Sequence, residues 1–252
     1  MTQPNQAATQ TLYQVSPYHF TDRPHDMINF LQAVGLRVEA SKDGWADLVG
    51  AGGRVGVHPL ASSGVDETST SLCLLASDAV AVAVQLQQAG FDARWWDESF
   101  GRQAAVQGPY GELTINEPMS DFHGYQRHDV TPAPDDPEVT VLAVLFVPDF
   151  TAAADFFAAF GFVGDEGRPG WRPLRSDQTS GAIGLHATDR DPEPGYVCGL
   201  SFETTEDLSA FADRLRARGY QVDDDRNAAA PHITVTDPDG NRIEVHPAGV
   251  RR

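Results

Sequence analysis

The chain has 252 residues, 18 of them basic and 36 acidic, which gives a formal net charge of −18 and a sequence pI near 4.6. This charge repels phosphate backbones and anionic membranes, so nucleic acid and membrane partners are not expected. No apolar run reaches the roughly 20 residues that cross a bilayer, and the first residues lack the basic and apolar stretches of a secretion signal, so we expect a cytoplasmic protein.

The first half of the chain predicts two successive units that each begin with a strand and a helix. The first helix is expected between Asp22 and Gly35, and short strands follow it as far as His58. The apolar run around Cys73 predicts a buried strand. The next helix ends before Gly90, where a glycine suits a helix C-terminus.

The second half shows the same order more clearly. The β-branched run VTVLAVLFV predicts a strand that ends before Asp149, a residue suited to cap the following helix. Apolar residues at spacings of three and four continue that helix to Gly161. A second helix is expected from Asp207 to Gly219, and HITVTDPDGNRIEVHP predicts two alternating strands joined by a tight turn.

The two halves repeat the same landmarks at offsets of 126 to 129 residues. The matched points are Gly35 and Gly161, Gly44-Trp45 and Gly170-Trp171, Gly56-Val57-His58 and Gly184-Leu185-His186, Leu72 and Leu200, Gly90 and Gly219, and Gly111 and Gly240. Residues 118–138 carry four prolines and no periodicity, which indicates a linker between modules at 1–117 and 139–252. We therefore expect an α+β fold in which tandem paired βαβββ modules form curled mixed sheets around a cleft.

These features resemble the vicinal-oxygen-chelate superfamily, which includes glyoxalase, extradiol dioxygenases and bleomycin-resistance proteins. The resemblance covers nearly the whole chain and depends on the opening FVPDFTAAADFFAAFGF and the more specific closing phrase DPDGNRIEVHP. The first half carries weaker versions, HFTDRPHDMINFLQAVGL and GPYGELTINEP. The resemblance implies that two modules in one chain supply the pairing that single-module relatives reach by dimerising. It thus favours a monomer, with a homodimer as the alternative.

Metal-dependent members of this superfamily bind a divalent cation through a His or Gln on the first strand, a His on the strand before the second helix and a Glu on the closing strand. Carried over to this sequence, the pattern gives Glu244 as the closing ligand, but the other positions fall at Leu142 and at or beside Gly199. The equivalents in the first half are Val15, Ser71 or a neighbour of it, and Ile115. One carboxylate holds a divalent metal poorly, so we expect no cofactor.

The closing strand predicts a polar group of ligand-binding residues. Strand alternation places Arg242, Glu244 and His246 on one face, and three inward polar side chains are unusual on a strand that only packs. The alternative is an internal Arg–Glu ion pair with the histidine at the rim. If a metal is bound after all, its ligands would be Glu244, His246 and His232, because His232 opens the adjacent strand.

Other candidate ligand-binding residues lie in the first half. Alternation from the first strand makes His19 a candidate for the cleft, although a hydrogen-bonded histidine at a strand end is the alternative. Trp95 and Trp96 are adjacent and cannot both face one side of a strand, so one of them is expected to cover the cleft or to contact the other module. Trp45 and Trp171 are interpreted as packing residues.

Two further pairs of residues are interpreted as structural. His58 and His186 match in the repeat, so a shared role in closing a turn is the simpler interpretation. Cys73 and Cys198 each lie in an apolar run, which predicts buried reduced thiols and not a disulfide.

The leading hypothesis is a protein that encloses a small hydrophobic or aromatic compound without the family metal and sequesters it. The main alternative is a metal-dependent lyase or dioxygenase of the same superfamily, with an altered ligand set around Glu244. A third hypothesis is a metal-independent enzyme that uses His19 or Glu244 as a general base. The sequence leaves open whether the protein is an enzyme.

Overall fold

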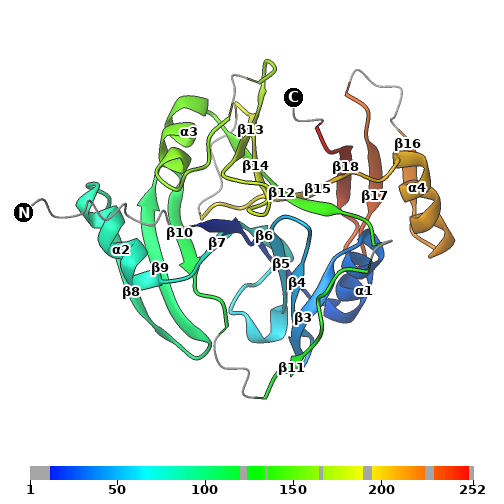
Figure 1. Cartoon of the computed structure of the whole chain (residues 1–252), viewed down its shortest axis with the longest axis horizontal. Coiled ribbons are helices and arrows are strands. Elements are labelled where there is room, and N and C mark those ends of the chain that lie inside the picture. Colours follow the sequence, from blue (N-terminus) through cyan, green and yellow to red (C-terminus); the bar gives the residue numbers. More distant parts are fainter. Residues whose placement is uncertain are drawn as a thin grey trace, which may run out of the picture.

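In the computed structural model, both halves of the chain mix strands and helices (Figure 1). The residues that the structure describes are 12–119, 124–133, 136–164, 167–189, 195–224 and 230–249. The strands form mixed sheets with parallel and antiparallel neighbours, and the helices pack against them. The expected α+β class and curled mixed sheets are therefore confirmed.

The N-terminal half contributes two sheets, with strand orders β1-β7-β10-β9-β8 and β11-β3-β4-β5-β2-β6. Its strands are β1 (Tyr13–Val15), β2 (Tyr18–Thr21), β3 (Arg37–Lys42), β4 (Trp45–Val49), β5 (Arg54–Pro59), β6 (Ser69–Ser71), β7 (Cys73–Ala76), β8 (Ala93–Glu98), β9 (Gly101–Gly108) and β10 (Gly111–Asn116). The short β11 (Gln126–Arg127) lies within the predicted linker and pairs with β3. The linker thus extends a sheet of the N-terminal half. The module boundaries stay predictions.

The C-terminal half forms one sheet with the strand order β13-β14-β12-β15-β18-β17-β16. Its strands are β12 (Val139–Val147), β13 (Trp171–Arg175), β14 (Ala182–Ala187), β15 (Gly199–Thr204), β16 (Val222–Asp224), β17 (Ile233–Thr236) and β18 (Arg242–Pro247). Strands β17 and β18 are the predicted closing hairpin, and Thr236 pairs with Arg242 next to the turn.

The helices begin and end largely where the sequence places them. They are α1 (Pro24–Val34), α2 (Ala79–Gln88), α3 (Phe150–Ala158) and α4 (Leu208–Ala217), together with a 3₁₀ turn, η1 (Leu60–Ser62). The carboxylates of Asp149 and Asp207 accept backbone N–H groups in the first turns of α3 and α4. Gly161 and Gly219 follow these helices with φ of 78° and 87°, a conformation that favours glycine. Helix α1 differs, because it follows Arg23 without a side-chain cap.

Backbone hydrogen bonds join the two halves along their strands. The Val15 N–H donates to the Ser180 carbonyl at 2.7 Å, and the Cys198 N–H donates to the Thr70 carbonyl at 2.8 Å. The buried apolar side chains of both halves form one continuous cluster. In Figure 1 the strands β6 and β7 lie beside β12 and β15 at the centre of the molecule. The halves therefore share a core while each keeps its own sheets.

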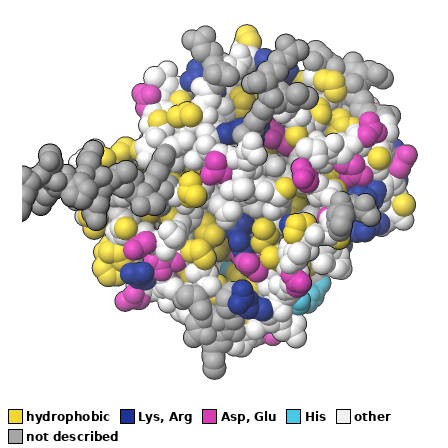
Figure 2. Space-filling view, viewed as in Figure 1, with side chains coloured by type: hydrophobic (Ala, Val, Ile, Leu, Met, Phe, Trp, Pro, Cys, Tyr) yellow, Lys and Arg dark blue, Asp and Glu magenta, His cyan; other side chains and the backbone are white. Residues whose placement is uncertain are grey.

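On the face shown in Figure 2, acidic and basic side chains are interspersed with hydrophobic ones. No helix in the described ranges combines the length and the apolar character needed to cross a membrane.

Candidate ligand-binding site

A cavity of about 670 Å³, which we call the C-terminal cavity, opens on the sheet of the C-terminal half. Polar, aromatic and aliphatic residues of the C-terminal half line this cavity, among them Val144, Phe146, Arg168, Trp171, His186, Ser201, His232, Arg242, Glu244 and His246. The N-terminal half closes one side of the cavity with His19 and residues 68–70. The structure therefore brings together His19, Arg242, Glu244, His246 and His232, five of the candidate residues.

Strand alternation explains why β18 supplies three of these side chains. Arg242, Glu244 and His246 line the cavity and are exposed or partly exposed there. Ile243 and Val245 between them are 2% and 0% exposed and belong to the core, although Ile243 also touches the cavity. The apolar residues fix the strand against the core, and the polar residues are left facing the cavity.

Glu244 and His246 form a hydrogen-bonded pair inside the cavity. The Glu244 Oε2 and His246 Nε2 atoms are 3.0 Å apart. The hydrogen bond from His246 lowers the pKa of Glu244, and nearby His232 and His186 act in the same direction against the effect of burial. The rings of His232 and His246 lie 5.5 Å apart between centroids. Glu244 is therefore an ionised acceptor surrounded by imidazole groups at neutral pH.

The opposite wall of the cavity is aromatic. His186 lies against Phe146 and Trp171, with ring centroids 5.4 Å and 6.3 Å away. The Trp171 ring covers Gly184 so closely that an added Cβ at this glycine would lie 2.2 Å from the indole. Gly184 thus admits the indole to the wall, and the wall presents flat surfaces on which a planar ligand can stack.

Two arginines supply positive charge to the cavity. Arg242 is paired with Asp223, with the Nη1 and Oδ2 atoms 2.7 Å apart. Arg168 is exposed at the rim, and its guanidinium has no ion-pair partner among the residues that the structure describes. Arg168 is therefore available to an anionic group of a ligand.

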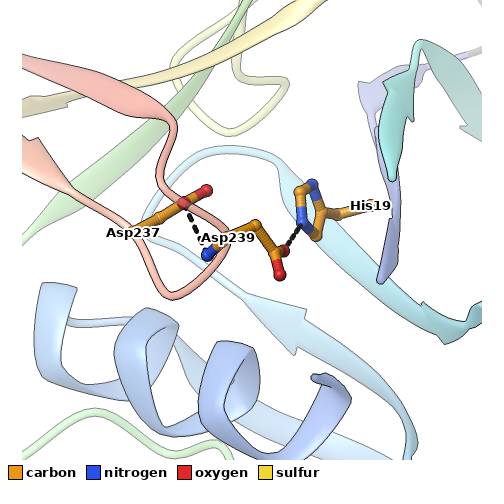
Figure 3. Close-up of side chains that lie close together, drawn as sticks. All are labelled: His19, Asp237 and Asp239. Carbon is orange, nitrogen blue, oxygen red and sulfur yellow. Dashed lines mark hydrogen bonds and ion pairs between the residues drawn. The ribbon is translucent and has the colours of Figure 1, made fainter. Parts of the chain in front are cut away.

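His19 joins the two halves beside the cavity (Figure 3). It is 2% exposed, and its Nε2 atom lies 2.8 Å from the Asp239 carboxylate in the turn between β17 and β18. A carboxylate can only accept, so Nε2 carries the hydrogen of this bond, and the Thr70 hydroxyl lies 2.8 Å from Nδ1. The Thr21 hydroxyl also donates to Asp239 at 2.9 Å. Both ring nitrogens of His19, within β2, thus have hydrogen-bond partners, and we call the contact with Asp239 the His19–Asp239 latch.

Among the described residues, one group of at least three His, Cys, Asp or Glu side chains has ligand atoms that all lie within 4.8 Å of one another. It contains both residues of the latch. This group is His19, Asp237 and Asp239. However, Asp237 Oδ1 accepts the backbone N–H groups of Asp239 and Asn241, and Oδ2 accepts from the Asn241 side chain. These bonds shape the β-turn, and the Asp239 carboxylate accepts the hydrogen bonds of the latch from His19 and Thr21. The closeness of these three side chains is therefore explained by the turn and by the contact between the two halves.

The positions of the family metal ligands form a row across three adjacent strands. The residue opposite Leu142 on β15 is Ser201, two residues after Gly199, near which the sequence placed the middle position, because Gly199 pairs with Val144 instead. The parallel register of β15 and β18 then places Ser201 beside Glu244. Neighbouring strands lie about 4.8 Å apart, so three ligands in this row could reach one cation. A leucine and a serine hydroxyl are poor ligands for iron or manganese. The residues present therefore do not fit the family's three-ligand metal site.

The alternative ligand set is not preassembled either. Glu244, His246 and His232 line the same cavity, but they are absent from the groups with mutually close ligand atoms in the described part of the chain. Cys198 also lines the cavity, and burial raises the pKa of its thiol to about 12, so it is a neutral thiol at ordinary pH.

The two adjacent tryptophans lie elsewhere. They belong to β8, at the end of the five-stranded sheet, and neither lines the C-terminal cavity. Trp95 is 44% exposed, and the Trp96 indole N–H donates to Glu98 at 2.6 Å. Alternation correctly separates the two side chains, but the sheet order that removes β8 from the cavity cannot be obtained from local sequence.

Sequence reasoning missed several residues of the cavity wall. Trp171 and His186 were interpreted as structural, and Phe146 and Arg168 were not singled out. His58 and His186 do share a turn contact, with Nδ1 3.0 Å and 2.9 Å from the next carbonyl oxygen, as the repeat suggests. The repeated histidine was the available signal, because one histidine can both hold a turn and line a cavity, as His186 does.

With the geometry in hand, comparisons place the C-terminal half in a family. The family model described as Glyoxalase/Bleomycin resistance protein/Dioxygenase superfamily matches residues 139–245. Residues 139–245 belong to this superfamily. The glyoxalase-superfamily segment includes Glu244 and most of the C-terminal cavity. No curated protein matches the chain.

Solved structures extend the similarity of fold to nearly the whole chain. The 2,3-dioxygenase LapB from Pseudomonas sp. KL28 is 16% identical, with a TM-score of 0.64 over 96% of this chain and 93% of that one. Homoprotocatechuate 2,3-dioxygenase from Brevibacterium fuscum, in complex with 3,4-dihydroxyphenylacetate, is 12% identical, with a TM-score of 0.62 over 94% and 80%. A Mn(II)-bound glyoxalase from Novosphingobium aromaticivorans is 15% identical, with a TM-score of 0.59 over 96% and 88%. The fold of nearly the whole chain, including both halves, is therefore similar to the fold of these proteins.

Proposed function

We propose that the protein binds a small hydroxylated aromatic acid in the C-terminal cavity, and that it does so with its own side chains in place of the family metal. The observation that carries this proposal is the combination, in one cavity, of an aromatic wall with the ionised Glu244 beside His246. The wall stacks on the ring of the ligand, and the carboxylate accepts a hydrogen bond from its hydroxyl group.

The acid group of the ligand is assigned to Arg168 at the rim of the cavity. A guanidinium pairs with a carboxylate through two parallel hydrogen bonds, and Arg168 has no other ion-pair partner in the described ranges. The similar dioxygenase that holds 3,4-dihydroxyphenylacetate supports this class of ligand, because that compound carries both hydroxyl and carboxylate groups on one ring system. The support is for the shape and chemistry of the ligand, not for a shared reaction.

A cavity of this kind suits a protein that sequesters its ligand. Leu142 and Ser201 occupy the row in which the family binds its metal, so Glu244 is left to act as an acceptor. Metal-dependent cleavage or isomerisation would need a different ligand set. The expected cytoplasmic location and the monomer or homodimer alternatives stay predictions alongside this function.

Calorimetric titration with 4-hydroxybenzoate tests the proposal. Glu244→Gln removes a charge-assisted hydrogen bond and should weaken binding roughly 10- to 100-fold, and Arg168→Ala should do so to a similar extent. Trp95→Phe and Trp96→Phe are matched controls, because these side chains lie outside the C-terminal cavity, and both variants should bind like the native protein. Equal binding by all four variants would rule out this site.

Elemental analysis separates the proposal from the metal-dependent alternative. Protein purified from a medium supplemented with iron, manganese, nickel and zinc should hold none of them in stoichiometric amount. A stoichiometric metal that is lost in Glu244→Ala would overturn the metal-free role and would favour an enzyme with an altered ligand set.

A further inference from the structure

The N-terminal half contains a second cavity, of about 450 Å³, which we call the N-terminal cavity. It lies between the two sheets of that half, with Tyr18 and Trp45 from one sheet and Asn116 and Gln103 from the other among its lining. The cavity opens to solvent, and its wall combines aromatic rings with buried polar side chains. These two kinds of group are what a specific ligand site offers.

The polar wall of the N-terminal cavity consists of amide and hydroxyl groups. Asn116 is 5% exposed, its side-chain N–H donates to the Tyr18 hydroxyl at 3.3 Å, and its oxygen accepts from Gln103 at 2.7 Å. A side-chain amide has two N–H groups and two acceptor positions, and these bonds use one of each. One donor and one acceptor of Asn116 are thus not used by these bonds within the part of the chain that the structure describes, and Asn116 lines the cavity.

Aromatic rings form the remaining walls. Trp45 and Tyr125 are in edge contact, with centroids 5.2 Å apart at 79°. Phe20 and His58 lie 5.7 Å apart and repeat the arrangement of Phe146 and His186 in the other half. These rings again offer flat surfaces to a planar ligand.

The charged side chains of this cavity are already paired within the protein. Asp47 is held by Arg54 at 2.8 Å, and Glu117 is held by Arg102 at 2.9 Å. No unpaired arginine corresponding to Arg168 lines this cavity among the described residues. An anionic ligand would therefore find no counter-ion, whereas an uncharged ligand could use the free amide positions.

We infer that the N-terminal cavity is a second, independent binding site, which takes an uncharged planar aromatic compound with an amide group. A primary carboxamide offers both an N–H and an oxygen, which complement the donor and the acceptor left on Asn116. The two cavities would then select ligands of the same shape by their charge. This inference goes beyond the proposed function and does not depend on it.

Two probes with the same ring and hydroxyl group test the inference: the neutral carboxamide 4-hydroxybenzamide for the N-terminal cavity and the carboxylate 4-hydroxybenzoate for the C-terminal cavity. Calorimetry on the full chain should show 4-hydroxybenzamide binding that saturating 4-hydroxybenzoate does not displace. Asn116→Leu should weaken 4-hydroxybenzamide about tenfold and leave 4-hydroxybenzoate unchanged. Arg168→Ala should have the reverse effect.

Trp45→Ala provides a second variant in case Asn116→Leu fails to fold, because Trp45 is only partly buried. It should weaken 4-hydroxybenzamide several-fold through lost stacking. Absence of 4-hydroxybenzamide binding, displacement by 4-hydroxybenzoate, or native affinity in the folded variants would overturn the second site. Failure of 4-hydroxybenzoate alone would defeat the proposed function and leave the second site standing.

Discussion

The two cavities occupy equivalent places in the two halves but differ in their polar walls. In each half a glycine lies under an aromatic ring, on the strand that pairs in parallel with the strand before the first helix of that half: Gly56 under Tyr18 and Gly184 under Trp171. The aromatic framework has thus been kept, although the covering ring comes from a different strand in each half. The polar groups differ: the N-terminal cavity has amides and paired ions, whereas the C-terminal cavity has a carboxylate with imidazole groups. Shape follows from the repeated fold, whereas selectivity depends on a few cavity-facing positions.

The largest expected effect comes from adding metal ligands to the row formed by Leu142, Ser201 and Glu244 on the C-terminal sheet. Leu142→His with Ser201→His places two imidazoles in the row that ends at Glu244, and we expect stoichiometric binding of Mn²⁺ or Fe²⁺. Metal at 100 times its dissociation constant should then stabilise the variant by about 2.7 kcal/mol, measured by denaturant unfolding. Adding Glu244→Gln should abolish the gain. Equal metal binding by the native chain would show that Leu142 and Ser201 do not prevent this protein from binding a metal.

The His19–Asp239 latch should affect the stability of both halves together. His19→Ala removes two hydrogen bonds and leaves the Asp239 carboxylate without its histidine, so we expect a loss of about 1–3 kcal/mol in the free energy of unfolding. A double-mutant cycle with Asp239→Ala, followed by urea unfolding, measures the coupling directly. Additive effects of the two changes would show that the latch contributes no joint stabilisation.

The two cavity glycines offer a matched comparison of the two sites. A Cβ at Gly184 would lie 2.2 Å from the Trp171 ring, and one at Gly56 would lie 2.6 Å from the Tyr18 ring. Each Gly→Ala change should cost about 1–3 kcal/mol of stability and should weaken only the ligand of its own cavity. Gly249→Ala, where a Cβ meets open space, is the control and should stay within about 0.5 kcal/mol. Loss of both ligands in either variant would contradict independent sites.

The smallest expected effect is the pH dependence that comes from Glu244. Because the pKa of Glu244 is lowered in the folded state, its stabilising effect is present above the unfolded pKa and is lost as the pH falls through the folded pKa. Glu244 is half exposed, so the difference from Glu244→Gln at neutral pH should stay below about 1 kcal/mol and vanish in acid. An NMR titration should show the Glu244 pKa rising in His246→Ala. An unchanged pKa would exclude His246 as the main cause.

Much of the C-terminal half could be predicted because its signals are local. The carboxylates of Asp149 and Asp207 cap the helices after them, and the apolar alternation of β18 places Arg242, Glu244 and His246 on one face. Each of these features depends on residues within one or two turns or along one strand. The binding role of the three β18 side chains stays a prediction.

Matching the halves by sequence offset was less reliable. The offsets made Val15 the counterpart of Leu142, but Tyr18 pairs with Gly56 as Val144 pairs with Gly184, so the counterpart is Ser16. Val15 is fully buried in the core. One residue of error reverses the face of a strand, which is why an approximate repeat cannot identify cavity residues.

The sequence by itself determined the repeated order of strands and helices, because apolar periodicity, caps and turn residues act between close neighbours in the chain. Only the tertiary structure decided that His19 reaches the turn at Asp239, that Trp95 and Trp96 lie away from the C-terminal cavity, and that each half keeps a cavity of its own. These features depend on sheet order and on contacts between residues as much as 220 positions apart, and no local pattern encodes them.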